Sequence, residues 1–145
     1  MTDDELKARM AIADRLGRIA LAGDARKAEA YAGCFALDGV LELGDPIGRL
    51  EGRAAILAWM TAPSVFAQAS GASPGFVCHH VTSSRIDMTG EGTAIGRTYF
   101  LVTTTAGIDH NGYYDDSFRQ DGGEWLIAHR RPRTLWISPA SVLHG

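Results

Sequence analysis

Long strand-forming segments fill the second half of the sequence and leave few folds open to it. They span residues 76–87, 93–105, 111–120 and 124–133. The short runs between them, TGEG, AGID and DGG, are rich in residues that favour hairpin turns. Segments joined in this way pair as antiparallel neighbours, and strands of this length twist and curl. The pattern therefore predicts a strongly curved antiparallel sheet.

The first half instead carries apolar residues at the spacing of three and four that is typical of helices. It predicts a helix from Leu6 to about Ala22, a second helix capped by the carboxylate of Asp24 and running to Phe35, and a third over 52–60. A short strand is expected at 40–43. Helices followed by a meander indicate an α+β fold. We expect the N-terminal helices to pack on the curved sheet and form a cone with an internal pocket.

Length and charge narrow the classes of function. The 145 residues predict a single domain, 1–145, and the net charge of -3 argues against a surface that binds nucleic acid. No apolar run is long enough to cross a bilayer, and the N-terminal sequence MTDDE is acidic where a secretory signal would be basic, so we expect a cytoplasmic protein without a membrane partner. Cys34 and Cys78 are expected to be free thiols.

Two adjacent histidines open the first long strand. Successive residues of a strand point to opposite faces, so only one of His79 and His80 shares a face with Val81. The two cannot bind one metal ion without a bulge, and no metal site is expected. The sequence also lacks the GxSxG, GxxxxGK[ST], GxGxxG and HExxH motifs of common enzyme classes.

Six segments together resemble the SnoaL-like branch of the nuclear-transport-factor-2-like superfamily. They are 29-EAYAGCFALDGVLEL-43, 52-GRAAI-56, 79-HHVTSSRI-86, 97-RTYFLV-102, 112-GYYDDSF-118 and 125-WLIAHRR-131. The branch is similar to scytalone dehydratase, steroid delta-isomerases, polyketide cyclases, bile acid 7-alpha-dehydratase and limonene epoxide hydrolase, and it also contains binding proteins without catalytic activity. The resemblance implies no cofactor, and it implies a homodimer formed through the outer face of the sheet.

The resemblance also assigns the histidines. In this branch a strand commonly begins with His, a bulky residue, Val, Thr and Asn, and its first histidine points into the cavity; here that histidine is His79, with Ser83 in place of the Asn. Similar dehydratases pair this histidine with a carboxylate from the loop after the first helix, and Asp24 has the matching position. A tyrosine often precedes that carboxylate by five residues, but this chain has Ile19 there.

The resemblance thus implies His79 as the acid/base and Asp24 as its orienting partner. The residues expected to contact a ligand are Ile19, Trp59, Phe66, Tyr99, Tyr114 and Asp116. Tyr31, Tyr99 or Tyr114 is expected to supply a hydroxyl in place of the absent tyrosine, and the spacing does not select among them.

Each of these residues also has a structural interpretation. Asp24 could be only a helix cap, and His79 a core histidine bonded to the backbone. Asp116 is expected to form an ion pair with Arg130 or Arg131. His110 lies near a predicted hairpin and is expected to be exposed.

Three hypotheses of function follow. The first is a cofactor-independent lyase, isomerase or cyclase that acts on a small, ring-bearing, mostly apolar metabolite. The second is a non-catalytic carrier or sensor of the same fold, which Ile19 favours because it removes a hydroxyl from the expected catalytic set. The third is an assembly subunit that buries the outer face of the sheet.

Overall fold

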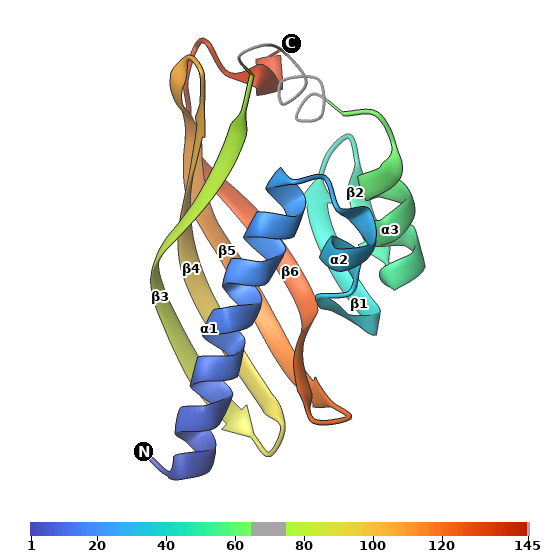
Figure 1. The fold of residues 1–145 in the computed structure, drawn as a ribbon, viewed down its shortest axis with the longest axis vertical. Helices are drawn as coiled ribbons and strands as arrows, with labels where there is room; N and C mark the ends of the chain where they lie inside the picture. Colours follow the sequence, from blue (N-terminus) through green and yellow to red (C-terminus); the bar gives the residue numbers. More distant parts are fainter. Residues whose placement is uncertain (65–74, 145) are drawn as a thin grey trace.

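The computed structural model describes residues 1–64 and 75–144 (Figure 1). The helices are α1 (Asp3–Asp24), α2 (Ala28–Ala32), α3 (Arg53–Thr61) and the short 3-10 helix η1 (Val142–His144). The strands are β1 (Phe35–Gly44), β2 (Gly48–Glu51), β3 (Val77–Gly90), β4 (Thr93–Thr104), β5 (Gly107–Asp121) and β6 (Glu124–Ile137).

The six strands form one open sheet in the order β2-β1-β6-β5-β4-β3. All neighbours are antiparallel except β1 and β6, which run parallel. The sheet curves, and α1 crosses its concave face, with α2 and α3 beside the end of the sheet formed by β1 and β2 (Figure 1). The α+β fold, with N-terminal helices on a curved and mostly antiparallel sheet, is confirmed.

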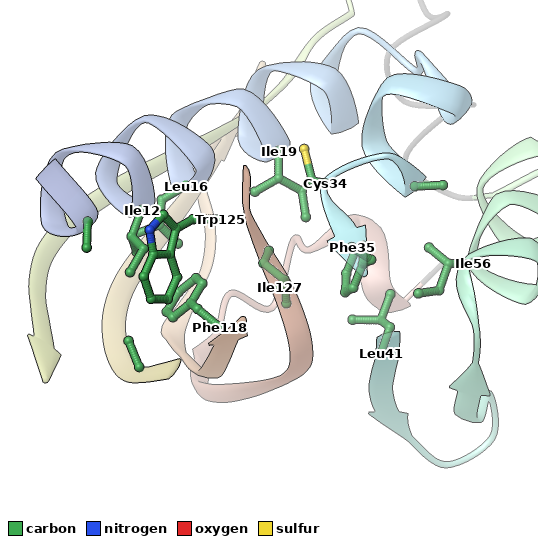
Figure 2. Close-up of a cluster of buried hydrophobic side chains, with 13 residues drawn as sticks. Ile12, Leu16, Ile19, Cys34, Phe35, Leu41, Ile56, Phe118, Trp125 and Ile127 are labelled. Carbon is green, nitrogen blue, oxygen red and sulfur yellow. The ribbon is translucent and has the colours of Figure 1, made fainter. Parts of the chain in front are cut away.

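A single apolar face attaches α1 to the sheet. The helix begins with a capping box between Thr2 and Glu5, and the spacing of its buried residues places Ile12, Leu16 and Ile19 on one side. These side chains pack with Phe118, Trp125 and Ile127 of β5 and β6 (Figure 2). Because Ile19 is anchored in this core, the last turn of α1 is held above the sheet.

The connection after α1 differs from the prediction. The second helix is shorter than expected, and its N-cap is Lys27 rather than Asp24, with no side-chain capping bond. Arg26 adopts a left-handed backbone with φ 55°, a conformation that costs a non-glycine residue about 1–2 kcal/mol. Its guanidinium compensates by donating to the carbonyl of Met60 (2.8 Å), near the end of α3. The carboxylate of Asp24 is therefore left available for another partner.

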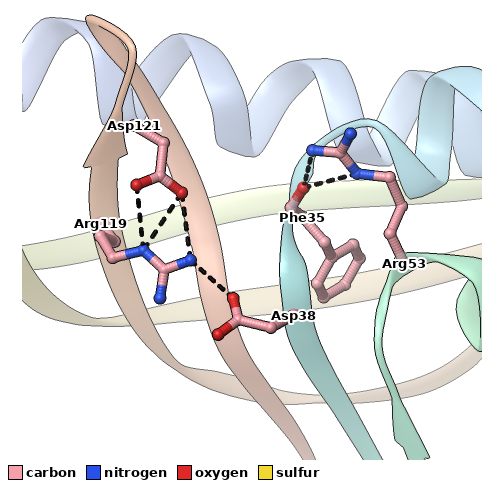
Figure 3. A network of polar contacts seen from close by, with 5 residues as sticks. All are labelled: Phe35, Asp38, Arg53, Arg119 and Asp121. Carbon is pink, nitrogen blue, oxygen red and sulfur yellow. Dashed lines mark hydrogen bonds and ion pairs between the residues drawn. The ribbon is translucent and has the colours of Figure 1, made fainter.

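Strand β1 begins at Phe35, where a longer second helix had been predicted. Figure 3 shows the guanidinium of Arg53, at the start of α3, donating two hydrogen bonds to the carbonyl of Phe35. Asp38 lies within β1, and Arg119 of β5 donates to its carboxylate as well as to that of Asp121. The extended backbone here accompanies pairing of Phe35 with Ile127 of β6, a long-range contact that the local apolar spacing does not contain.

Within the part of the chain that the structure describes, no helix combines the length and the apolar character needed to span a bilayer.

Candidate active site

A cavity of ≈ 90 Å³ lies where the end of α1, α2 and α3 face the inner side of β3, β5 and β6. Its apolar wall includes Ile19, Trp59, Met60 and Val77. Its polar lining consists of Asp24, Arg26, Tyr31, His79, Tyr114 and Arg130. Apolar walls with a few convergent polar groups are characteristic of small-molecule sites.

Asp24 and His79 are in direct contact at this cavity. The Asp24 Oδ1 atom lies 2.7 Å from His79 Nδ1, and its Oδ2 accepts from the His79 backbone N–H at 2.8 Å. Both side chains are largely shielded, with exposed fractions of 17% and 24%. A carboxylate accepts hydrogen bonds, so the contact places a proton on Nδ1, and in the neutral ring Nε2 is then the basic nitrogen. The second bond fixes the backbone of His79 as well as its ring.

A group of hydrogen-bond donors forms a second part of the cavity. Arg130 makes a bidentate ion pair with Asp116, at 2.8 and 2.9 Å, and its guanidinium lies 3.8 Å from the centre of the Tyr114 ring. Burial alone would lower the pKa of Arg130, but Asp116 outweighs it and holds that pKa above its ordinary range. The guanidinium is therefore a fixed positive charge.

The two tyrosines of the cavity remain protonated donors. Burial raises the pKa of Tyr31 to about 12. Burial likewise raises the pKa of Tyr114, although Arg130 acts in the opposite direction. Both rings are thus phenols at neutral pH, able to donate to an oxygen in the cavity.

The residues expected to contact a ligand fall into three groups. Ile19, Trp59 and Tyr114 line the cavity, whereas Asp116 lies behind Arg130 with only 1% of its side chain exposed. The expected pairing of Asp116 is confirmed, with Arg130 as the partner. Phe66 is outside the described residues.

Tyr99 is not part of the cavity. Its side chain is 47% exposed and meets Tyr113 edge-on, at 6.3 Å between ring centres, so it lies on the outer face of the sheet. The reason is alternation along β4, where the neighbouring Thr98 and Phe100 are buried instead. Of the three candidate tyrosines, the structure brings Tyr31 and Tyr114 to the cavity.

A second histidine–aspartate contact, between His110 and Asp109, is not expected from the sequence. His110 was expected to be exposed near a hairpin, but it is buried, and its Nδ1 lies 2.6 Å from the buried carboxylate of Asp109. A register shift between β4 and β5 at Val102 and Thr103 interrupts the alternation, so two consecutive residues of β5 are both buried. In the sequence, only the adjacency of Asp109 and His110 pointed to this contact. Alternation along a strand predicts that two adjacent residues point to opposite faces.

Burial of His110 predicts a pH-dependent stability. Burial lowers the pKa of His110 below its ordinary value of 6.5, with a further contribution from nearby His79, and it outweighs the opposing effect of Asp109. The unfolded chain therefore takes up this proton at a higher pH than the folded chain does, so the free energy of unfolding should fall as the pH drops through 6.5.

Urea unfolding measures the free energy of unfolding at several pH values and tests this expectation. The pH should range from about 7.5 to about 5, because histidine titrates in this interval. The variant His110→Asn should show a shallower pH dependence than the wild type. His80→Asn, at an exposed histidine on β3, should keep the wild-type slope. Equal slopes for all three proteins would show that His110 does not carry the effect.

Among the described residues, no group of three or more His, Cys, Asp or Glu side chains is arranged to hold a metal ion.

Comparison with known proteins places this chain in a family. The model of the SnoaL-like domain matches residues 4–131, and the chain belongs to that family. No curated protein matches the sequence significantly.

Three solved structures illustrate the similarity. A protein of unknown function from Mycobacterium tuberculosis is 27% identical, with a TM-score of 0.77 over 93% of this chain and 76% of that one. A candidate scytalone dehydratase from Novosphingobium aromaticivorans is 23% identical, with a TM-score of 0.79 over 95% and 91% of the two chains. LinA is 20% identical, with a TM-score of 0.75 over 94% and 91%. The last two likenesses establish the fold alone.

Proposed function

We propose that this protein is a cofactor-independent lyase, isomerase or cyclase that acts on a small, ring-bearing, mostly apolar metabolite. His79 is the general acid/base, and Asp24 orients it. The observation that carries the proposal is the contact between Asp24 and His79 at the wall of a cavity, because a histidine with a carboxylate on one nitrogen is suited to proton transfer through the other.

The reaction that fits this arrangement begins with proton removal next to a carbonyl group of the substrate. The proton passes to Nε2 of His79, and Asp24 stabilises the imidazolium that forms. Returning the proton to a leaving hydroxyl completes a dehydration, while returning it to a different carbon completes an isomerisation. Both outcomes use the same base.

Stabilisation of the developing oxyanion is assigned to Tyr31, Tyr114 and Arg130. Tyr31 and Tyr114 are neutral phenols that line the cavity, and Arg130 is positively charged over the Tyr114 ring. Donors fixed in place before the reaction stabilise charge at no cost of reorganisation. They take the role left open by Ile19, where similar dehydratases have a tyrosine.

The charges at the cavity favour a neutral substrate. The charge of Arg130 is balanced by Asp116, and the remaining charged groups of the lining are one cation, Arg26, and one carboxylate, Asp24. These charges balance, so the cavity offers no excess of positive charge to attract an anionic substrate. One structural neighbour of the same fold carries the name of an enzyme, a candidate scytalone dehydratase.

A non-catalytic binding protein is the second candidate. Ile19 favours it, because this fully buried apolar side chain lines the cavity at the position of the expected tyrosine. Such a protein would use the same apolar walls and the same donors to hold a ligand without converting it.

Analysis of a co-purified ligand tests the two candidates. Protein purified without detergent is extracted, the bound compound is identified by mass spectrometry, and it is returned to a small amount of protein in D₂O. An enzyme should form product or replace a substrate proton by deuterium, since His79 removes that proton. Recovery of the compound unchanged and free of deuterium would support a binding protein and contradict the enzyme.

A further inference from the structure

The buried carboxylate of Asp109 joins the C-terminal segment to the inner face of the sheet. Its Oδ2 atom lies 2.6 Å from His110 Nδ1 and accepts from the hydroxyl of Ser141 at 2.6 Å. Its Oδ1 atom accepts from the backbone N–H of Val142 at 2.8 Å, and the Asp109 carbonyl accepts from the N–H of Ser138 at 2.8 Å. Both carboxylate oxygens are thus satisfied, as a buried charge requires.

These bonds determine the protonation of His110. Burial would raise the pKa of Asp109, but the bonds from Ser141, His110 and Val142 outweigh burial and hold that pKa below its ordinary value. Asp109 is therefore ionised at neutral pH and only accepts, so His110 carries its proton on Nδ1. The ring is fixed in one tautomer by a carboxylate, as in the contact between Asp24 and His79.

The His110 ring lies near the ring of His79 and near that of Phe100. Its centre lies 6.5 Å from that of His79, with the two planes at 84°, and 5.8 Å from that of Phe100. Phe100 stacks on Tyr114 at 4.6 Å, and Tyr114 lies under Arg130. A continuous row of rings therefore connects the proposed base with the proposed oxyanion donors.

We propose that His110 is a positioning residue for His79, and that residues 138–143 hold it in place through Asp109. This inference rests on the proposed function, since it assigns the support of the same base. Asp24 fixes the Nδ1 edge of the His79 ring, and His110 restricts its tilt from another side. A reacting group displaced by about 1 Å loses about a hundredfold in rate, so such restriction matters for catalysis.

The experiment reads the geometry of His79 without a substrate. In ¹⁵N-labelled protein, the proton shared by His79 Nδ1 and Asp24 is observed by NMR, and its exchange with water is measured. Asp109→Asn should accelerate this exchange by roughly tenfold, and Ser141→Ala by a smaller factor in the same direction, because each weakens the support of His110. His80→Ala, at the exposed neighbour bonded to Thr103, should leave the exchange unchanged.

Backbone amide exchange in α1 and β3 separates positioning from general loss of stability. If Asp109→Asn does not fold, Ser141→Ala still decides the question, since it removes a single hydroxyl. Acceleration at His79 with unchanged amide exchange supports the inference. The inference is overturned if exchange of the His79 proton is unchanged, or if it accelerates only by the same factor as exchange of the backbone amides.

Failure of this inference is distinguishable from failure of the proposed function. If both substitutions accelerate proton exchange at His79, but the protein leaves its ligand unconverted, the positioning contact is supported and the enzyme is contradicted. If the protein converts its ligand, but proton exchange at His79 is unchanged in both Asp109→Asn and Ser141→Ala, the enzyme is supported and the role of His110 is overturned.

Discussion

Replacement of His79 by alanine is expected to lower the kcat for the identified substrate by about 10²- to 10⁴-fold, the usual contribution of a positioned general base. The apolar wall of the cavity, formed by residues such as Ile19, Trp59 and Met60, is left unaltered by this substitution, so binding of the substrate should change little. Kinetic analysis of the purified variant with the compound found by extraction measures both quantities. The loss should therefore be in kcat rather than in KM.

His80→Ala is the matched control for this prediction. The two histidines are adjacent on β3, but His80 is exposed and lies 3.0 Å from the hydroxyl of Thr103, away from the cavity. Its removal should leave kcat within about twofold of the wild type, as for a surface substitution. Asp24→Asn should show an intermediate loss, since an amide disturbs the tautomer of His79. Full activity of His79→Ala would contradict the assignment of the base.

Replacement of Asp116 by alanine is expected to lower the free energy of unfolding by about 3–5 kcal/mol, because it leaves the Arg130 charge buried and unpaired. The two side chains expose only 1% and 4% of their surface, and both bonds between them are shorter than 3.0 Å in the structure. Urea unfolding measures the loss. The variant should also bind the extracted ligand more weakly, since Arg130 lines the cavity.

The neighbouring ion pair provides the control. Asp115 forms the same kind of bidentate contact with Arg97, at 2.8 and 3.1 Å, but the two side chains are 40% and 56% exposed. Asp115→Ala should therefore cost only about 0–1 kcal/mol. The double variant Asp116→Leu with Arg130→Met should be more stable than Asp116→Ala, because no buried charge remains. Equal losses at Asp115 and Asp116 would refute this account.

Several features of the fold could be predicted because they depend on local pattern. The order of helices and strands follows from the change in apolar spacing near residue 76, and the hairpins follow from the residues between strands. The opposite orientations of His79 and His80 follow from alternation along a strand. The helix after Asp24 was predicted too long, since the bond from Asp24 to His79 competes with the expected cap.

The candidate site depended on more than local pattern. The resemblance to a family suggested the pairing of Asp24 with His79, which are 55 residues apart in sequence. Alternation along β4 separates its residues into two faces but does not indicate which face is concave. Tyr99 was therefore expected to contact a ligand, although it lies on the outer face. The choice of Arg130 over Arg131 as the partner of Asp116 likewise depends on which side of β6 faces inward.

The sequence alone thus determined the first helix, the third helix and the four long strands, and which neighbours in a strand point to opposite sides, since these properties depend on the backbone and on nearby residues. Tertiary structure decided which side is the inside, how far apart distant carboxylates and histidines lie, and where a register shift buries Asp109 and His110 together. Curvature and register are set by the packing of the whole sheet against α1, so no short segment of the chain contains them.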